Sequence, residues 1–235
     1  VERLISMLAS VAPRQMEKRI TLHRVSLVGV IHTAGGFAEA RRSGIDAAEI
    51  RVDALPEPPA LRKVAGLPVP AIITVRRADE GGIKPISEQE RLASYLSFLP
   101  AAGAVDIELR SARRLREVLE LAGRNKAVRI ISFHDFKTTP SLVKLRSICA
   151  RARGLGADIV KIASRTESPA DVARLLFLLG EATEPVAVMG MGPLGCASRL
   201  LFAKAGSVLN YGWLGAPQVA GQWGAREFRR LLELV

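Results

Sequence analysis

Short apolar segments rich in β-branched residues alternate with longer amphipathic segments from residue 25 to the end of the chain. Successive apolar segments begin roughly 25 to 30 residues apart, which is the spacing of repeated βα units. The apolar segments predict eight strands: Val25–His32, Ala47–Leu55, Pro70–Arg77, Ala104–Arg110, Ala127–Phe136, Ala157–Ser164, Pro185–Met191 and Ser207–Trp213. The amphipathic segments predict eight helices: Gly36–Ser43, Pro59–Ala65, Ser87–Leu99, Ala112–Gly123, Ser141–Gly154, Ser168–Glu181, Gly195–Ala205 and Ala225–Leu234.

Eight strands, each followed by a helix, predict a single-domain (β/α)8 TIM barrel over residues 25–235. A doubly wound open sheet is the alternative. Ser87 and Glu90 have the spacing of a capping box, and Pro140 and Pro169 stand where a first helical residue is expected. In a barrel of this kind, functional side chains gather at the carboxyl ends of the strands and on the following loops.

Residues 1–24 do not follow this repeat. Val1–Val11 has the pattern of a short amphipathic helix, and Pro13 and a basic stretch come after it. We interpret residues 1–24 as an N-terminal extension that either covers the bottom of the barrel or ends a linker.

The composition is that of an ordinary globular protein, with 49% apolar and 24% charged residues among 235. The longest apolar runs, such as Leu175–Leu179, fall far short of the ~20 residues that a membrane span needs, so we expect no membrane association. Cys149 and Cys196 lack the spacing of a disulfide framework or a zinc site. We therefore expect no metal and a cytoplasmic location.

The net charge of +11 comes from 34 basic and 23 acidic residues, and 26 of the basic residues are arginines. Such a balance can indicate a nucleic-acid partner or an anionic substrate. The arginines are spread over the helix-like segments without interleaved aromatic residues, which favours a solvated outer face. We expect no nucleic-acid partner.

Ionisable residues interrupt five successive predicted strands near the same rim of the barrel: Glu49, Arg51 and Asp53, then Arg76, then Asp106 and Glu108, then His134, then Lys161. Side chains two residues apart share a strand face, so these groups are expected to converge inside the barrel. A layer of structural ion pairs is one interpretation, because a lone charge inside a barrel is costly. Their recurrence on neighbouring strands favours a functional site.

Lys161 carries the most information, because four apolar residues flank it on a central strand. Burial, together with cations such as Arg76 or Arg51, favours the neutral amine, which is a nucleophile towards ketones and aldehydes. A structural pair with Glu108 or Asp135 is the alternative. His134 on the neighbouring strand is a general acid or base near neutral pH, or else a hydrogen-bonded core residue.

A glycine-rich segment, Met189–Arg199, follows the seventh strand, where barrels often bind anions at a helix N-terminus. It is not a dinucleotide-binding fingerprint, since no acidic residue follows at the required spacing. Arg199 at the start of the next helix can hold a carboxylate with two hydrogen bonds, or can be an ordinary helix arginine.

Six motifs, in order along nearly the whole chain, resemble type I 3-dehydroquinate dehydratases, the Schiff-base enzymes of the shikimate pathway. The matched segments are Glu49–Asp53, Thr74–Gly82, Asp106–Glu108, Ser132–Phe136 with Thr139-Pro140, Asp158–Ala163 and Met189–Arg199.

The resemblance implies a hydro-lyase that converts 3-dehydroquinate to 3-dehydroshikimate without a cofactor. Lys161 would form an imine with the C3 ketone, and His134 would move the C2 proton and protonate the departing C1 hydroxyl. Glu80 would orient and charge the imidazole, and Arg199 would bind the substrate carboxylate. Glu49, Arg51 and Arg76 would bind the ring hydroxyls.

The chain departs from the family pattern after the eighth strand. Relatives usually carry a Ser-Ala-Pro-Gly-Gln loop that closes over the substrate, whereas the aligned residues here are Gln218–Gln222. Gly221 and Gln222 are kept, Gln218 replaces the serine and Ala220 replaces the proline. We therefore count Gln218 and Gln222 among the substrate-binding residues.

Two other classes stay open on the sequence alone. Another Schiff-base barrel lyase, of the aldolase or transaldolase type, would also use a strand lysine, but it leaves Glu80 and the His134 motif unexplained. A nucleic-acid binder accounts for the charge but not for Lys161. The sequence is compatible with a homodimer.

Overall fold

The computed structural model describes residues 20–22 and 24–234, and all eight predicted strands are present there. The strands are β1 (Ser26–Ile31), β2 (Ala47–Arg51), β3 (Ala71–Thr74), β4 (Ala104–Glu108), β5 (Val128–Asp135), β6 (Ile159–Arg165), β7 (Val186–Met191) and β8 (Leu209–Trp213). The helices are α2 (Gly36–Ala40), α3 (Leu61–Ala65), α4 (Glu88–Phe98), α5 (Arg116–Arg124), α6 (Leu142–Gly154), α7 (Pro169–Glu181), α8 (Gly195–Lys204) and α9 (Ala225–Leu234), with short 3-10 helices η2 (Ala78–Glu80) and η3 (Leu99–Ala101).

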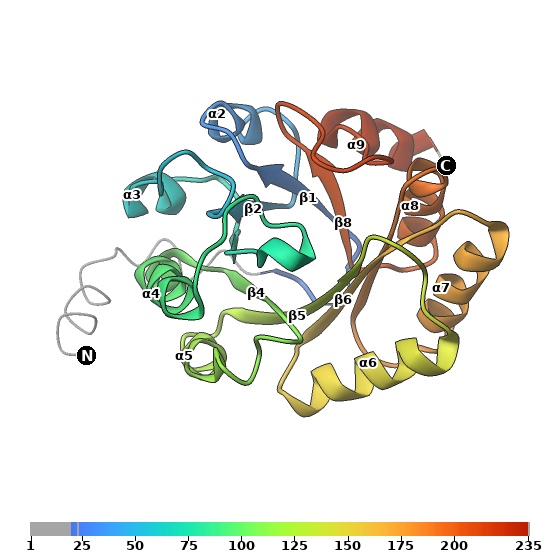
Figure 1. The fold of residues 1–235 in the computed structure, drawn as a ribbon. Helices are drawn as coiled ribbons and strands as arrows, with labels where there is room; N and C mark the ends of the chain where they lie inside the picture. Colours follow the sequence, from blue (N-terminus) through green and yellow to red (C-terminus); the bar gives the residue numbers. More distant parts are fainter. Residues whose placement is uncertain (1–19, 23, 235) are drawn as a thin grey trace.

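The eight strands form a parallel sheet in the order β7-β6-β5-β4-β3-β2-β1-β8, so β1 lies between β2 and β8. The amide of Val208, just before β8, donates to the carbonyl of Val186 at the start of β7 over 3.1 Å, which closes the ring. The helices surround the strands, and the last helix, α9, lies beside α8 (Figure 1). The predicted (β/α)8 barrel is confirmed, and the open sheet is excluded.

The observed helix starts can be compared with the capping residues and prolines that predicted them. Ser87 and Glu90 form the expected capping box at the start of α4, and Pro169 is the first residue of α7. Pro140 does not begin a helix: α6 starts two residues later, because Ser141 caps it by accepting a hydrogen bond from the amide of Lys144. Thr139, the residue before Pro140, does not cap this helix, since its hydroxyl donates to the carbonyl of Arg165.

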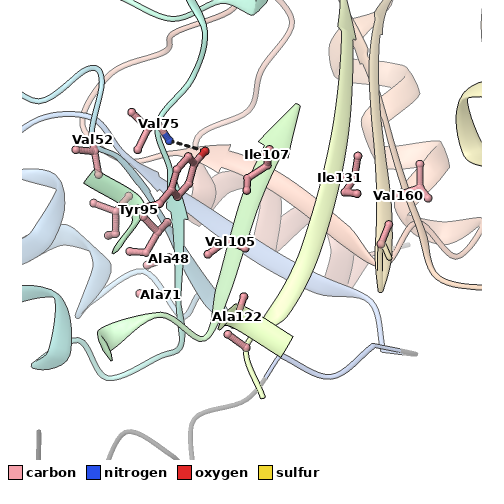
Figure 2. Close-up of a cluster of buried hydrophobic side chains, with 14 of the residues drawn as sticks. Ala48, Val52, Ala71, Val75, Tyr95, Val105, Ile107, Ala122, Ile131 and Val160 are labelled. Atoms are coloured by element: carbon pink, nitrogen blue, oxygen red, sulfur yellow. Dashed lines mark hydrogen bonds between the residues drawn. The ribbon is translucent and has the colours of Figure 1, made fainter. Parts of the chain in front are cut away.

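Side chains along each strand alternate between two buried clusters. One lies between the strands and the helices, where the buried Tyr95 of α4 binds the amide of Val75 with its hydroxyl (Figure 2). The other fills the barrel with residues such as Ile72, Ile130 and Ile159, which share a face with Lys161.

Ile20 and Leu22 pack against the cluster inside the barrel. Most of the predicted N-terminal extension, residues 1–24, including the helix expected over Val1–Val11, lies outside the described residues.

The described part of the chain contains no helix long and apolar enough to cross a membrane. Exposed arginines on the outer helices pair with carboxylates, as Arg116 does with Glu120 and Arg146 with Glu181. These pairs agree with the expected solvated outer face.

Candidate active site

A cavity of about 150 Å³ opens at the carboxyl ends of the strands. All nine side chains expected at the site line it: Glu49, Arg51, Arg76, Glu80, His134, Lys161, Arg199, Gln218 and Gln222. The barrel thus brings together residues that are up to 173 positions apart in the chain. The apolar part of the wall comes from residues without a role expected from the sequence, chiefly Met189, Met191 and Phe136.

Lys161 on β6 is buried, with 4% of its side chain exposed. Its Nζ atom donates to Asp106 Oδ2 over 2.7 Å and to Glu49 Oε1 over 3.2 Å, and it lies 3.8 Å from the ring centre of Tyr211. Its nearest charged neighbours are therefore carboxylates and not the guanidinium groups that we expected. These two carboxylates fix the position of the amine in the cavity.

Asp106 connects Lys161 to Arg76. Its Oδ2 atom also accepts from Arg76 Nη2 over 2.8 Å, and its Oδ1 atom accepts from Ser132 Oγ over 2.6 Å. Burial alone would raise the pKa of Asp106, but the positive charges of Arg76 and Lys161 outweigh it and hold this pKa below its ordinary value. The carboxylate stays ionised and fixes both cations in place.

Arg91, which was not among the site residues expected from the sequence, lies behind this layer. It stands on α4 with 1% of its side chain exposed, donates to the carbonyl of Val75 over 2.8 Å and pairs with Glu108. Glu108 in turn accepts from Arg76 Nη1 over 3.2 Å. A signal was present, since an arginine among the buried-face positions of an amphipathic helix requires a partner.

Arg51 is held by Asp53, whose Oδ2 atom accepts from Arg51 Nη2 over 2.7 Å. The same nitrogen donates to the carbonyl of Gly81 over 2.9 Å, and Arg51 Nη1 reaches Gln218 Oε1 at 3.5 Å. One guanidinium group therefore contacts both the loop after β3 and the loop after β8.

Glu80 lies beneath His134, and its Oε2 atom is 3.2 Å from both the ring Nδ1 and the backbone amide of His134. The next residue, Gly81, has φ +89°, and a Cβ atom there would lie 2.6 Å from the Phe136 ring. The turn that positions Glu80 therefore requires glycine at position 81. Burial and the charge of Glu108 raise the pKa of Glu80 to about 7. Burial, followed by Arg76 and Lys161, lowers the pKa of His134 well below 6.5.

These contacts suit the orienting role expected for Glu80. They do not favour the expected charging of the imidazole, since burial opposes the charged form of both side chains. At neutral pH the imidazole of His134 is therefore uncharged, and its Nε2 atom is not bonded to any described residue.

Arg199 on α8 is buried and differs from the other arginines of the site. Its Nε atom donates to the carbonyl of Gly190 over 2.9 Å and its Nη1 atom to the carbonyl of Tyr211 over 3.2 Å, but no described carboxylate pairs with it. Burial lowers the pKa of Arg199 to about 10, so it remains charged at neutral pH. Its remaining N–H donors are available to an anion.

Most charged side chains in and next to the cavity are paired, and Arg199 is the exception. Four cations, Lys161, Arg51, Arg76 and Arg91, face four carboxylates, Glu49, Asp53, Asp106 and Glu108. Arg199 is a fifth cation and pairs with no described carboxylate, while Glu80, a further carboxyl group of the cavity, has a pKa of about 7 and is only partly ionised at neutral pH. A guanidinium group without a paired carboxylate suits an anionic ligand.

The loop after β8 is anchored at its far end. Gly192 N donates to the carbonyl of Ala220 over 3.0 Å, and a Cβ atom on Gly221 would lie 2.8 Å from Gly195 Cα, so Gly221 must be glycine for this contact. Gln218 and Gln222 both face the cavity, and the Oε1 atom of Gln222 is buried without a described partner.

The described residues contain no group of three or more His, Cys, Asp or Glu side chains that could hold a metal ion. They do bring together a buried lysine amine, a histidine imidazole in contact with a carboxyl group, and an arginine that pairs with no described carboxylate. This set is suited to imine chemistry on an oxygenated acid.

Residues 32–235 match the family model described as type I 3-dehydroquinase. The 3-dehydroquinate dehydratase of Methanocella arvoryzae is 37% identical over 187 residues, which cover 78% of this chain and 84% of the relative. That of Pyrococcus abyssi is 33% identical over 214 residues, covering 89% and 98%.

The fold comparison agrees with the sequence comparison. The crystal structure of the type I 3-dehydroquinate dehydratase from Clostridium difficile superposes with a TM-score of 0.80 at 27% identity, over 92% of this chain and 97% of that one. The match to the family model covers the barrel from β2 to α9 and all nine expected site residues, from Glu49 to Gln222. The chain belongs to the type I 3-dehydroquinase family.

Proposed function

We propose that this protein removes water from 3-dehydroquinate to give 3-dehydroshikimate, through an imine on Lys161. The observation that carries the proposal is the placement of the buried Lys161 amine in the same cavity as the His134–Glu80 pair and Arg199, which pairs with no described carboxylate. Family membership supports the reaction, and the geometry supports the roles of the residues.

The first stage joins Lys161 to the ketone. The neutral amine adds to C3, the carbonyl oxygen becomes the hydroxyl of a carbinolamine, and this hydroxyl leaves as water. In total, one lysine ammonium group and one ketone give one protonated imine and one water. Asp106 and Glu49 hold Nζ over the cavity during this stage.

The second stage removes the C2 proton and the C1 hydroxyl. The protonated imine draws electrons from C2, so its proton becomes acidic enough for the neutral imidazole of His134 to take it. The resulting enamine expels the C1 hydroxyl, which leaves as water with the proton from His134. A second water then hydrolyses the imine and frees Lys161. Glu80 keeps the imidazole oriented through its contact with Nδ1.

Substrate binding is divided among the remaining residues. Arg199 holds the carboxylate, while Glu49, Arg51 and Arg76 bind ring hydroxyls through the donors and acceptors that their ion pairs leave over. Gln218 and Gln222 cover the substrate from the loop after β8.

Borohydride reduction in the presence of 3-dehydroquinate tests the nucleophile, because it converts an imine into a stable secondary amine. We expect one adduct per chain by intact mass, mapped to the peptide that contains Lys161, and none in Lys161→Ala. Lys137 and Lys204 serve as internal controls, and an adduct on either of them would refute the assignment.

The His134→Ala variant separates the two stages. We expect it to be trapped by borohydride but to lose roughly 10²- to 10⁴-fold in kcat, because C2 proton removal lacks its base. Turnover is followed by the ultraviolet absorbance of the product enone. Near-normal kcat in this variant would exclude His134 as the base, and product without an enone would indicate an aldolase-type reaction.

A further inference from the structure

The chain contains two tyrosines, and both are buried: Tyr95 between the strands and the helices, and Tyr211 inside the barrel. The hydroxyl of Tyr95 accepts from the amide of Val75 over 3.1 Å (Figure 2). It also donates to the carbonyl of Asp106 over 2.6 Å. The hydroxyl of Tyr211 is also buried, yet it has no hydrogen-bond partner among the described residues.

An unpartnered buried hydroxyl costs free energy, so its presence calls for a partner or a function. Phenylalanine would fill the same space without that cost. The position of Tyr211 suggests the partner, because this residue lines the cavity and its ring faces Lys161 Nζ at 3.8 Å. Its backbone carbonyl also accepts from Arg199, which fixes the end of β8 beside the anion site.

The phenol is a reliable donor at this place. Burial, and then the charges of Glu49 and Asp106, raise the pKa of Tyr211 well above 10, so the hydroxyl keeps its proton at every pH at which the protein works. Since Nζ lies against the face of the ring, the hydroxyl at the ring edge is not bonded to the amine. Tyr211 and Lys161 line the same cavity, which is where the attacked carbon and its oxygen would be held.

We propose that Tyr211 is a further catalytic residue, whose hydroxyl donates a hydrogen bond to the C3 oxygen of the substrate as Lys161 adds to it. This inference rests on the proposed function. The hydrogen bond stabilises the negative charge that develops on the oxygen when the C=O electron pair moves onto it, and it persists to the carbinolamine hydroxyl. Tyr211 keeps its own proton throughout, so the balance of the imine-forming stage is unchanged.

Tyr211→Phe tests the inference, because it removes one oxygen atom and keeps the ring against Lys161. Single-turnover trapping with borohydride measures imine formation directly. We expect the variant to form the adduct roughly 100- to 1,000-fold more slowly than the wild type, the scale on which one donor to a developing oxyanion acts. The thermal midpoint should be no lower than that of the wild type, whereas Tyr95→Phe should melt earlier because it loses two hydrogen bonds.

The outcomes separate this inference from the function on which it rests. If the wild type forms no adduct at all, the proposed function fails. If the wild type is trapped and Tyr211→Phe is trapped equally fast, the hydroxyl has no part in imine formation and only this inference is overturned. A higher KM with an unchanged trapping rate at saturating substrate would overturn it as well.

Discussion

The two sides of the cavity are built differently. We call the β2–β4 side the paired wall: its charged residues Glu49, Arg51, Asp53, Arg76, Asp106 and Glu108 all bond to one another or to neighbouring groups. We call Arg199, Tyr211 and Gln222 the open wall. There the guanidinium group has no carboxylate, and the Tyr211 hydroxyl and Gln222 Oε1 are buried without a described partner.

Because of this difference, we expect the two walls to have different functions. Paired charges are stable without substrate, so the paired wall can hold Lys161 in one geometry at all times, which is the kind of preorganisation that catalysis uses. Unpartnered groups gain their hydrogen bonds only when a ligand arrives. The open wall is therefore expected to supply most of the binding energy, and the paired wall most of the stability of the site.

Asp106→Asn should have the largest effect, because it removes the charge that faces both Lys161 and Arg76. Removing the charge of one partner of a buried ion pair typically costs about 3–5 kcal/mol, and we expect the free energy of unfolding to fall by that amount. Urea unfolding measures it. Asp79→Asn is the matched control: Asp79 is exposed and pairs with surface arginines, so its loss should cost at most about 1 kcal/mol. Equal losses in the two variants would contradict the structural role of the paired wall.

Glu80→Gln should change how stability depends on pH. The pKa of Glu80 rises from 4.5 to about 7 on folding, so between these values the native protein holds a proton that the unfolded chain has released. The stability contributed by this group is therefore full below about pH 4.5 and is lost as the pH rises through about 7.

A glutamine at position 80 does not titrate, so the variant should gain up to about 3 kcal/mol relative to the wild type between about pH 5 and about pH 8. Urea unfolding at both pH values provides the measurement. Glu120→Gln, on the outer surface of α5, should keep the wild-type pH dependence. A constant difference between Glu80→Gln and the wild type would show that Glu80 does not titrate in this range.

Arg199→Ala tests the open wall. A charged hydrogen bond of this kind is typically worth about 1.5–3 kcal/mol, so KM for 3-dehydroquinate should rise roughly 10- to 100-fold. The thermal midpoint should fall much less than in Asp106→Asn, because removing an unpaired buried charge offsets two lost hydrogen bonds. Arg114→Ala, an exposed arginine, is the control and should leave KM unchanged. An unchanged KM in Arg199→Ala would remove Arg199 from the binding site.

The smallest effect is expected in the loop after β8. Proline restricts a flexible loop and is worth about 0.4–1 kcal/mol where its geometry fits, so Ala220→Pro combined with Gln218→Ser should lower KM a few-fold at nearly constant kcat. Steady-state kinetics checks this, with Gln222→Ala as the variant that should raise KM. If both variants behave like the wild type, residues 218–222 do not cover the substrate.

The sequence by itself determined the barrel and predicted nine side chains that line one cavity. The alternation of apolar and amphipathic segments depends only on local burial, so it located every strand, and charges two residues apart on β2 and β4 had to share a face. The strand positions then placed Lys161, His134 and Arg76 at one rim. Helix starts were predicted less accurately than strands. Helix α5 begins at Arg116 and not at Ala112, because the Ser111 hydroxyl is hydrogen-bonded to Arg91 and Glu88 and does not cap a helix there.

Only the tertiary structure decided which groups pair. Residues that share a rim can form many combinations, and the closure of the ring selects one of them by distance: Asp106 and Glu49 for Lys161, Glu108 for Arg91, and no carboxylate for Arg199. The same closure leaves the Tyr211 hydroxyl without a partner while Tyr95 has two. Sequence patterns report the face on which a side chain lies, whereas electrostatic and hydrogen-bond energies depend on separations of a few ångströms between atoms far apart in the chain.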